Sequence, residues 1–519
     1  MKKFILLCLV AMTSISTGVA QKVTAKWSEE QDPKKGTPTD NFWVKNGKVF
    51  FVSEFGITTA DVKTLKILEK HDFKVATKKT TFLEVVMVKG KVWLFTRNTA
   101  DKVNYVKAYP IDDNGKVIEA PIELAAFKDD KKTFATDNKG TTVIILNSRD
   151  SSKIAVVINS NGKEKEKALS YVNVFDTDLK RLWTQVIEFP YIQKQFQVKC
   201  NVVTNTGEIQ LVTKVYDDQK AEECKSETQA AYKYVICTYS AKNSKGKETA
   251  VDLGGKFVGS IYVKTRPDNG NTMIIGLYAN KNTNKSFTST MVLNGFFYTE
   301  VAPDGKVANK YTTEINATKI KSISKEILRE KENGMTAQLM IKDVFFKKDG
   351  SIVVLTEQFY STFSQQYNSK GQPSGSSTIY HADDNIVLSF DPKGKLKWAT
   401  DVPKRQAAAN LQSSVGARAF FKNDNLFLIY IDLLTNLKKE PDGTPPSTAR
   451  GVPAVTAIAL IASDGKLTRK AFNAPKESKE YVYFRNWSER LNDDEFLYTA
   501  VKSRLFNYKY KLVRMKLEP

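Results

Sequence analysis

Histidine is almost absent from this chain, which has two in 519 residues, His71 and His381. Zinc sites and Ser-His-Asp or Cys-His relays need imidazole as a ligand or a base, so the sequence offers little material for them. CxxC pairs, a phosphate-binding glycine loop and the D-x-[DN]-x-[DN]-G pattern of a calcium loop are missing as well. We therefore expect no metal and no cofactor, and the sequence indicates no catalytic residue.

Cysteine is also scarce, with four residues in the chain, and Cys8 lies in an apolar N-terminal stretch. Beyond that stretch three cysteines remain, and an odd number in an exported protein leaves at least one unpaired. Cys224 and Cys237 flank one long connection, and we predict a disulfide between them. Cys200 is interpreted as a small buried side chain that fills space.

Long apolar runs are missing everywhere except near the N-terminus. Lys2 and Lys3 precede an apolar stretch from Phe4 to Met12, and small residues follow at 18–20. This order is typical of a secretory signal peptide, which we place at residues 1–20, with an uncleaved anchor as the alternative. No later segment approaches the ~18 to 20 apolar residues that span a bilayer. We predict an exported protein that is periplasmic, outer-membrane-associated or secreted.

The net charge is strongly one-sided, at +22. Nucleic acid is not an expected partner for an exported chain, whereas an acidic envelope protein or an anionic glycan would be attracted by such a field. Lysines are spread evenly through the sequence, however, as they are where they solubilise strands and discourage edge pairing. The charge therefore limits the class of partner without locating a site.

The chain repeats one sequence motif about eight times: a tight polar turn followed at once by an apolar run rich in β-forming residues. Examples are Asn46-Gly47-Lys48 before VFFV and Asp349-Gly350-Ser351 before IVVL. A second turn of the form Asx-x-Gly-Lys follows most copies, as at Asp304-Gly305-Lys306 and Asp464-Gly465-Lys466. Glycine or asparagine supplies the positive φ of tight hairpin loops, so each module is predicted to be a four-stranded antiparallel meander.

These meanders in tandem predict an all-β fold, a single β-propeller over residues 21–519. We predict eight four-stranded blades, with seven as the alternative, because the repeats number about eight. The last module lacks a fourth strand, and residues 22–28 alternate like one, so we expect an N-terminal strand to close the ring. A single helix is predicted, over 317–333. The predicted modules span residues 38–76, 80–126, 132–190, 192–253, 257–316, 335–403, 415–475 and 480–519.

The segment Ser389–Trp398, SFDPKGKLKW, resembles the end of a blade in quinoprotein-type (PQQ-like) propellers, and Val174–Trp183 is a weaker copy. The resemblance covers about ten residues per blade and implies blade architecture only. The other modules lack the tryptophan, so it implies no quinone cofactor. Trp183 and Trp398 are interpreted as packing between blades.

Insertions interrupt only the second-to-third-strand and between-blade connections, which in a meander share one face of the ring. They span 216–231, 278–289, 317–334, 358–384 and 433–455. Loops held by a rigid scaffold commonly carry binding sites. The insertion at 358–384 mixes aromatic and small polar residues, as binding surfaces do. Its candidate binding residues are Phe359, Tyr360, Phe363, Tyr367, Tyr380 and His381.

The sequence therefore predicts an exported, non-catalytic binding or scaffold propeller that recognises an envelope protein or an anionic glycan through its insertion-bearing face. It would lie peripheral to the outer membrane if its partner does. The alternative is a carbohydrate-active hydrolase or lyase that uses two carboxylates in the central funnel, and whether the protein is an enzyme stays open. The carboxylates considered for this chemistry are Asp217, Glu357, Asp383 and Asp384.

Overall fold

The computed structural model describes most of the chain between residues 23 and 517. The described residues are 23–31, 42–52, 56–73, 80–128, 142–159, 163–282, 291–315, 327–329, 331, 334–336, 338–367, 369–410, 412, 415–438, 454–472, 481–492, 494–503 and 508–517. The predicted signal peptide and most of the predicted insertion at 433–455 lie outside these residues. No helix in the described part is long and apolar enough to cross a membrane.

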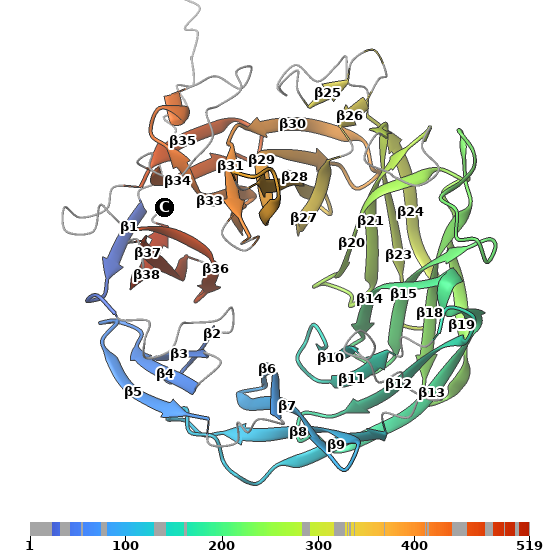
Figure 1. Cartoon of the computed structure of the whole chain (residues 1–519), viewed down its shortest axis with the longest axis horizontal. Coiled ribbons are helices and arrows are strands. Elements are labelled where there is room, and N and C mark those ends of the chain that lie inside the picture. Colours follow the sequence, from blue (N-terminus) through green and yellow to red (C-terminus); the bar gives the residue numbers. More distant parts are fainter. Residues whose placement is uncertain are drawn as a thin grey trace, which may run out of the picture.

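The chain forms one all-β propeller in which sheets follow one another around a central axis (Figure 1). In each large sheet the first strand lies nearest the axis and the last lies at the rim. The first four sheets contain β2 (Phe42–Lys45), β3 (Lys48–Val52), β4 (Gly56–Asp61) and β5 (Ile67–Asp72); β6 (Thr80–Val88), β7 (Lys91–Ala100), β8 (Val103–Ile111) and β9 (Ile122–Lys128); β10 (Thr142–Asn147), β11 (Ile154–Asn159), β12 (Lys167–Phe175) and β13 (Arg181–Ile192); and β14 (Phe196–Val203), β15 (Ile209–Tyr216), β18 (Tyr232–Ser240) and β19 (Asn243–Val251).

The second half of the ring repeats the pattern. Its sheets contain β20 (Phe257–Thr265), β21 (Thr272–Ala279), β23 (Gly295–Val301) and β24 (Val307–Glu314); β27 (Leu339–Phe346), β28 (Ile352–Tyr367), β29 (Pro373–Phe390) and β30 (Leu396–Val402), joined by β31 (Gln406–Ala409); β32 (Arg418–Lys422), β33 (Asn425–Leu433), β34 (Ala454–Ile461) and β35 (Leu467–Ala471); and β36 (Val482–Arg490), β37 (Glu495–Ser503), β38 (Tyr508–Leu517) and β1 (Val23–Trp27). Two 3₁₀ turns, η2 (Gln193–Gln195) and η6 (Asn436–Lys438), are also present.

Two smaller sheets accompany the large ones. β16 (Cys224–Ser226) pairs with β17 (Gln229–Ala230), and β22 (Val292–Leu293), β26 (Gly334–Thr336) and β25 (Leu328–Arg329) form a three-stranded sheet at the outer rim (Figure 1). Among the described residues, eight sheets have four or five strands and this one is a ninth of three or more. The structure thus has nine such sheets instead of the eight or seven blades that the sequence predicted.

The ninth sheet was not predicted, because its strand β25 lies in the segment assigned to a helix over 317–333, and β22 and β26 lie on either side of that segment. Most of 317–333 lies outside the described residues, but Leu328–Arg329 is a strand and not a helix. Ile327 and Leu328 are buried with Leu293 and Met335 in the core between the β20–β24 and β27–β30 sheets. Short apolar runs do not distinguish helix from strand, so the sequence could not separate the two here.

The N-terminal strand closes the ring, as predicted. β1 pairs antiparallel with β38 in a register that joins Val23 to Leu517 and Trp27 to Val513. The backbone pairing continues past the strand, where the Ser28 N–H donates to the Leu512 carbonyl at 2.9 Å. One sheet therefore combines both ends of the described chain, which removes an exposed edge from the last meander.

The predicted disulfide between Cys224 and Cys237 is not formed. Cys200, Cys224 and Cys237 are all free thiols. Cys224 lies in the small hairpin β16–β17, whereas Cys237 lies inside β18, where it is paired with Leu211 of the neighbouring strand. Proximity in sequence did not bring the two sulfurs together, because one lies in the insertion and the other in the sheet itself.

Apolar strands explain why the sheets stack. The second strand of a sheet is buried on both faces, as in β15 and β21, where every residue is buried. Strands of this kind are near-continuous apolar runs because neighbouring sheets cover both sides. Aromatic pairs cross these interfaces, with ring centroids 4.2 Å apart for Phe296 and Phe390 and 4.1 Å apart for Phe420 and Phe496.

The repeated Asx-x-Gly-Lys turn supplies a second contact between sheets. In the turn before β30, the Asp391 carboxylate accepts the backbone N–H groups of Lys393 and Lys395, both at 2.9 Å. Gly394 has φ +83° and its carbonyl accepts a hydrogen bond from Thr313 of the preceding sheet. A Cβ added at Gly394 would lie only 2.1 Å from the ring of Tyr311, so no side chain fits there.

The interface, or seam, between the β27–β30 and β32–β35 sheets repeats this arrangement. The Gly465 carbonyl accepts from Thr400 at 2.6 Å, and the Trp398 ring lies 2.8 Å from the position of a Cβ. Trp398 Nε1 also donates to the Ser463 carbonyl at 3.1 Å, and Trp183 Nε1 donates to the Gly207 carbonyl at 2.9 Å. Both tryptophans therefore pack between sheets, as the sequence indicated.

These turns yield a test with an internal control. Gly394→Ala should destabilise the protein by about 2–5 kcal/mol, because it adds positive-φ strain and an overpacked methyl group. Gly90→Ala should cost only about 1–2 kcal/mol, because Gly90 has a similar φ of +80° but no atom within 4 Å of the added Cβ. Urea denaturation of both variants checks the difference, and equal losses would show that the contact with Tyr311 is unimportant.

Candidate functional site

The insertions contact one another on one face of the ring. Strand β22 comes from one insertion and β26 from another, and they pair through Val292 and Thr336. The Asn282 N–H donates to the Glu227 carbonyl at 2.8 Å, which joins the connection that contains β22 to the insertion at 216–231. The opposite face carries the tight turns described above, so the asymmetry that the sequence indicated is present in the described residues.

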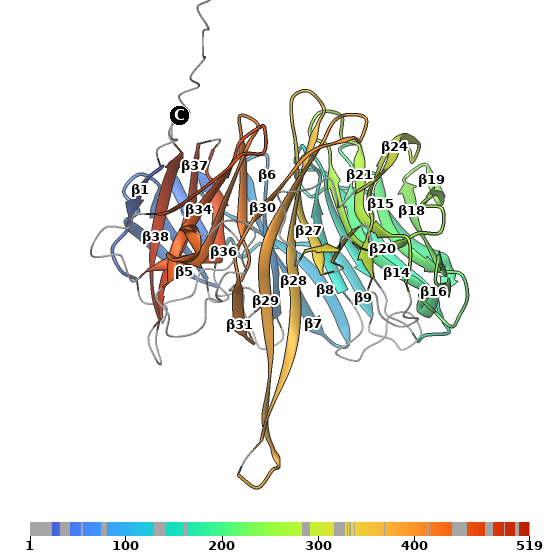
Figure 2. The ribbon, with the colours of Figure 1, turned by 90° about the horizontal axis from the view of Figure 1, so that it is seen from above.

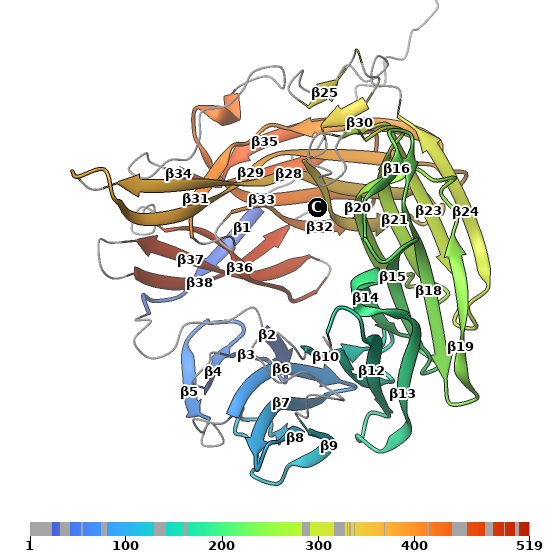
Figure 3. The same cartoon turned by 45° about the vertical axis from the view of Figure 1, so that its right-hand side comes forward.

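The largest described insertion is a long hairpin formed by the outer parts of β28 and β29. It projects well beyond the ring (Figures 2 and 3). β27 pairs with β28 only as far as Gln358, while β28 and β29 remain paired from Ile352 to Tyr367. We call residues 359–382 the projecting hairpin. The sequence placed an insertion here but did not predict that it is a regular antiparallel ribbon.

Four of the six predicted binding residues share one face of the projecting hairpin. The pairing of Ser361 with Tyr380 places Tyr380 on the same face as Phe359, Phe363 and Tyr367. The rings of Phe359 and Tyr380 are stacked with centroids 6.4 Å apart. Phe363 is 69% exposed and Tyr367 is 63% exposed. We call these four side chains the aromatic stripe.

The other two predicted residues, Tyr360 and His381, lie on the opposite face. They are directly paired, and their rings stack at 4.5 Å with an angle of 7° between the planes. The Tyr360 hydroxyl donates to Asp383 Oδ2 at 3.0 Å, and His381 Nε2 lies 3.0 Å from Thr362 Oγ1. Burial raises the pKa of Asp383, although the hydrogen bond from Tyr360 opposes the shift. This pair stabilises the ribbon where it leaves the ring.

Lys404 holds the base of the projecting hairpin. It is fully buried, and its Nζ lies 2.9 Å from Glu357 Oε1 of β28 and donates at 2.7 Å to the Ala382 carbonyl of β29. Glu357 is also fully buried; it lies 3.2 Å from Lys342 Nζ and accepts the Ala417 N–H at 3.1 Å. One lysine therefore binds both strands at the point where the register shifts.

The short strand β31 connects the base of the projecting hairpin to the next sheet. β31 pairs with β29 from Ile379 to Ala382. Gln406 of β31 donates through Nε2 to the Ile431 carbonyl at 2.7 Å and accepts the Gly416 N–H through Oε1 at 2.6 Å. The base of the hairpin is thus hydrogen-bonded to the β32–β35 sheet, which fixes its direction relative to the ring.

The carboxylates considered for glycoside chemistry occupy structural positions. Glu357 is in the ion pairs just described, and Asp384 accepts the Lys404 N–H at 3.0 Å. Asp217 follows the end of β15 and forms an ion pair with Lys225 at 2.7 Å. In glycoside chemistry the two carboxyl groups lie about 5 to 10 Å apart on either side of an open cleft. Within the described residues these carboxylates lie in ion pairs and hydrogen bonds, which suits a structural role.

One cavity of about 440 Å³ lies between the β10–β13 and β14–β19 sheets. Its lining includes Asn159, Phe189, Phe196, Lys199 and Asn201. Lys199 Nζ donates to Gln197 Oε1 at 2.8 Å. Among the described residues that line this cavity there is no carboxylate and none of the predicted binding residues.

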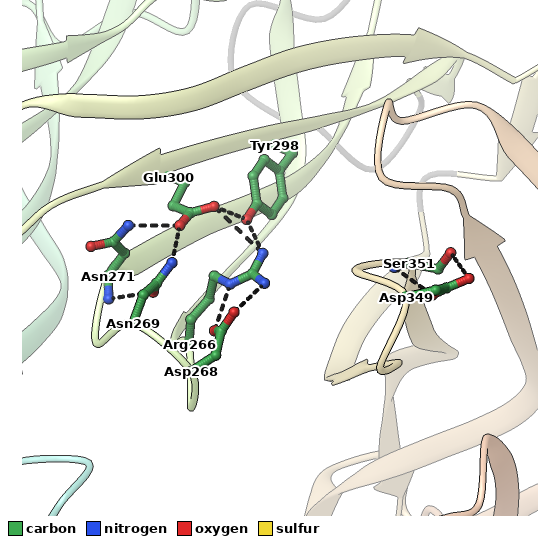
Figure 4. Close-up of polar contacts among 8 residues, drawn as sticks. All are labelled: Arg266, Asp268, Asn269, Asn271, Tyr298, Glu300, Asp349 and Ser351. Atoms are coloured by element: carbon green, nitrogen blue, oxygen red, sulfur yellow. Dashed lines mark hydrogen bonds and ion pairs between the residues drawn. The ribbon is translucent and has the colours of Figure 1, made fainter.

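A polar cluster on the face of the ring that carries the tight turns was not predicted from the sequence (Figure 4). Glu300 accepts hydrogen bonds from Tyr298 at 2.6 Å, Asn269 at 2.9 Å and Asn271 at 2.7 Å. Arg266 binds Asp268 through two nitrogens at 2.9 and 2.7 Å. Burial alone would raise the pKa of Glu300, but these hydrogen bonds and Arg266 hold it below its ordinary value. Such saturated bonding is typical of a structural turn.

Lys404, Lys342 and the Glu300 cluster could not be identified from the sequence, because the partners of each come from other strands or turns. The ribbon itself left a signal. Phe359, Phe363 and Tyr367 stand four residues apart, so in an extended strand they fall on one face.

No protein-family model matches the chain, and a search of curated proteins finds no match either. The quinoprotein resemblance is therefore not confirmed. Among solved structures, the polysaccharide lyase Uly1 is 10% identical with a TM-score of 0.37, over 84% of this chain and 89% of that chain. The WD40 domain of SCAP from fission yeast is 6% identical with a TM-score of 0.40, over 96% and 98% of the two chains. The N-terminal domain of Nup159 is 10% identical with a TM-score of 0.27, over 61% and 72%.

Removing the buried lysine should release the base of the hairpin. Lys404→Met should cost about 3–5 kcal/mol of unfolding free energy, because it leaves Glu357 buried without its nearest cation. The double variant with Glu357→Gln should lose less than the sum of the single losses, by about 1–3 kcal/mol. Denaturation of the four proteins in this cycle measures the coupling, and strictly additive losses would rule out the described contact.

We expect the stability of the protein to depend on pH through Glu300. The folded pKa of Glu300 lies below its ordinary value, so its stabilising effect is present above the unfolded pKa and is lost as the pH falls through the folded pKa. Glu300→Gln should therefore destabilise the protein by about 1–3 kcal/mol at pH 7. The difference from the wild type should shrink in unfolding experiments below about pH 4. A difference that is constant with pH would contradict the assigned ionised state.

Proposed function

We propose that this protein is an exported, non-catalytic binding or scaffold propeller that recognises a protein of the cell envelope through the projecting hairpin. Export rests on the N-terminal segment at residues 1–20, whose pattern is that of a signal peptide. The ring serves as a rigid support, and the hairpin carries the recognition surface away from it (Figure 2).

The observation that carries this proposal is the aromatic stripe on a supported ribbon. Phe363 and Tyr367 are 69% and 63% exposed, although large aromatic side chains gain most free energy from burial. Exposed aromatics that are held in place lose little conformational entropy when a partner covers them. Support from Lys404 and β31 at the base supplies this preorganisation.

The charge of the hairpin favours a protein partner over an anionic glycan. Residues 358–382 contain one lysine, Lys370, and no aspartate, glutamate or arginine, in a chain that is 26% charged. Anionic glycans need several cations at the contact, which this segment does not offer. Apolar and aromatic anchors surrounded by hydroxyl and amide groups are typical of protein–protein contacts. The positive charge of the whole chain would then speed the encounter with an acidic partner.

The test is capture of envelope proteins by variants of the stripe. The double variant Phe363→Ser with Tyr367→Ser should reduce capture from intact envelopes at least tenfold. Its free energy of unfolding should stay within about 1 kcal/mol of the wild-type value, because both side chains are exposed. The matched control is Leu182→Ser with Val186→Ser on β13, which are 46% and 55% exposed. These residues lie outside the hairpin, and their replacement should leave capture unchanged.

A second variant removes the ribbon beyond its supported part. Replacing residues 365–376 with Asn-Gly keeps the pairing of Ser364 with Ser377 and supplies a two-residue turn. This variant should fold and lose its partner. An unchanged set of captured proteins in both variants would show that recognition lies elsewhere.

A further inference from the structure

The outer edge of β28 lacks a partner strand over residues 361–367 in the described structure. β27 pairs with β28 only between Ile352 and Gln358, and β29 pairs with the other edge. Ser361, Thr362, Phe363, Gln366 and Tyr367 are all exposed. This is a strand edge in solvent, away from the ring (Figure 3).

One printed hydrogen bond identifies which backbone groups point outward along this edge. The Phe359 N–H donates to the Gln338 carbonyl at 2.9 Å, on the side opposite to β29. Backbone groups alternate sides along a strand, and the pairing of β28 with β29 is regular from Phe359 to Gln366. The N–H and C=O groups of Ser361, Phe363, Gln365 and Tyr367 therefore point to the free edge.

This edge has no charge or proline against pairing, and its one register shift lies near its end, between Gln366 and Tyr367. Natural edge strands carry charges, proline or a bulge that prevents another strand from adding to them. Residues 361–367, Ser-Thr-Phe-Ser-Gln-Gln-Tyr, include no charge and no proline, in a chain that is 26% charged. Serine, threonine, glutamine and aromatic side chains are compatible with cross-strand pairing.

We propose that the free edge of β28 pairs with the same edge of a second copy of this chain, antiparallel about Ser364. The pairs would be Ser364 with its counterpart, Phe363 with Gln365 and Ser361 with Tyr367, so that all four outward-pointing residues are used. Antiparallel pairing of these residues forms roughly eight backbone hydrogen bonds between the copies. The two hairpins become one four-stranded sheet.

A second copy fits this edge because the edge is complementary to itself. The register opposes no like charges, although each chain carries +22. Ser364 lies about 23 Å along the strand from Glu357, so the two rings stand apart by about twice that length. Charge repulsion over such a separation is screened, because the Debye length is about 8 Å at physiological salt.

The pairing also places the aromatic stripes together. Residues directly opposite in an antiparallel pair have side chains on the same face, so both copies present Phe363 and Tyr367 on one side of the new sheet. This inference goes beyond the proposed function, because it depends on the backbone edge of β28 and the proposed function depends on the aromatic side chains.

A charge-exchange experiment at Ser364 tests the register. Light scattering of the mature chain during size-exclusion chromatography should give a dimer for the wild type. Ser364→Lys and Ser364→Glu should each be monomeric, with dimerisation weakened at least tenfold, because like charges meet at the symmetry axis. An equimolar mixture of the two variants should restore the dimer.

The control is Ser376→Lys, which places the same charge on β29 of the same hairpin and should leave the dimer intact. A monomeric wild type at tens of micromolar would overturn the proposal. A Ser364→Lys dimer, or variants that fail to recover on mixing, would do the same. Capture of envelope proteins is measured separately, so its failure is distinguishable from failure of dimerisation.

Discussion

The structure depends on a contact that recurs at several seams between neighbouring sheets, in which a glycine turn of one sheet fits against the last strand of the sheet before it. The turn needs glycine for two reasons. Gly394 and Gly465 have positive φ, and each lies against an aromatic ring that leaves no space for a Cβ. The carbonyls of both glycines accept hydrogen bonds from threonines of the neighbouring sheet. Backbone conformation, packing and hydrogen bonding thus act at one residue.

This constraint also decides where insertions are tolerated. A turn that is enclosed by the next sheet cannot be lengthened without breaking the contact. The connections on the opposite face are free of it, and there the chain forms the β16–β17 hairpin, the β22–β26–β25 sheet and the projecting hairpin. Lys404 and β31 then stabilise the longest insertion against the ring. The turn face stabilises the fold, and the insertion face is available for binding.

Much of this was accessible from the sequence because it is local and repeated. The glycine turns, the closing strand at 23–27 and the packing of Trp398 follow from short patterns whose physical causes lie within a few residues. In the described part of the predicted helix over 317–333, Leu328–Arg329 is a strand instead, because its pairing with β26 and the packing of Leu328 near Leu293 are not visible in the local pattern. The Cys224–Cys237 disulfide failed because spacing along the chain does not give the distance between two sulfurs.

The candidate site was predicted in part. The aromatic residues of 358–382 identified the segment, but the sequence treated it as an irregular loop and so could not assign its faces. Its division into the aromatic stripe and the Tyr360–His381 pair follows from strand register, which is set by β27, β30 and β31 together. Lys404 was unpredictable for a similar reason, since its partners Glu357 and Ala382 come from two strands.

Native-state hydrogen exchange of a Gly465→Ala variant would test the seam contact most directly. The account predicts that exchange accelerates first in β30 and in β34–β35, the strands on either side of the altered turn, while the β6–β9 sheet keeps its protection. Acceleration that is uniform around the ring, or absent at this seam, would contradict the view that each glycine turn locks its own pair of sheets.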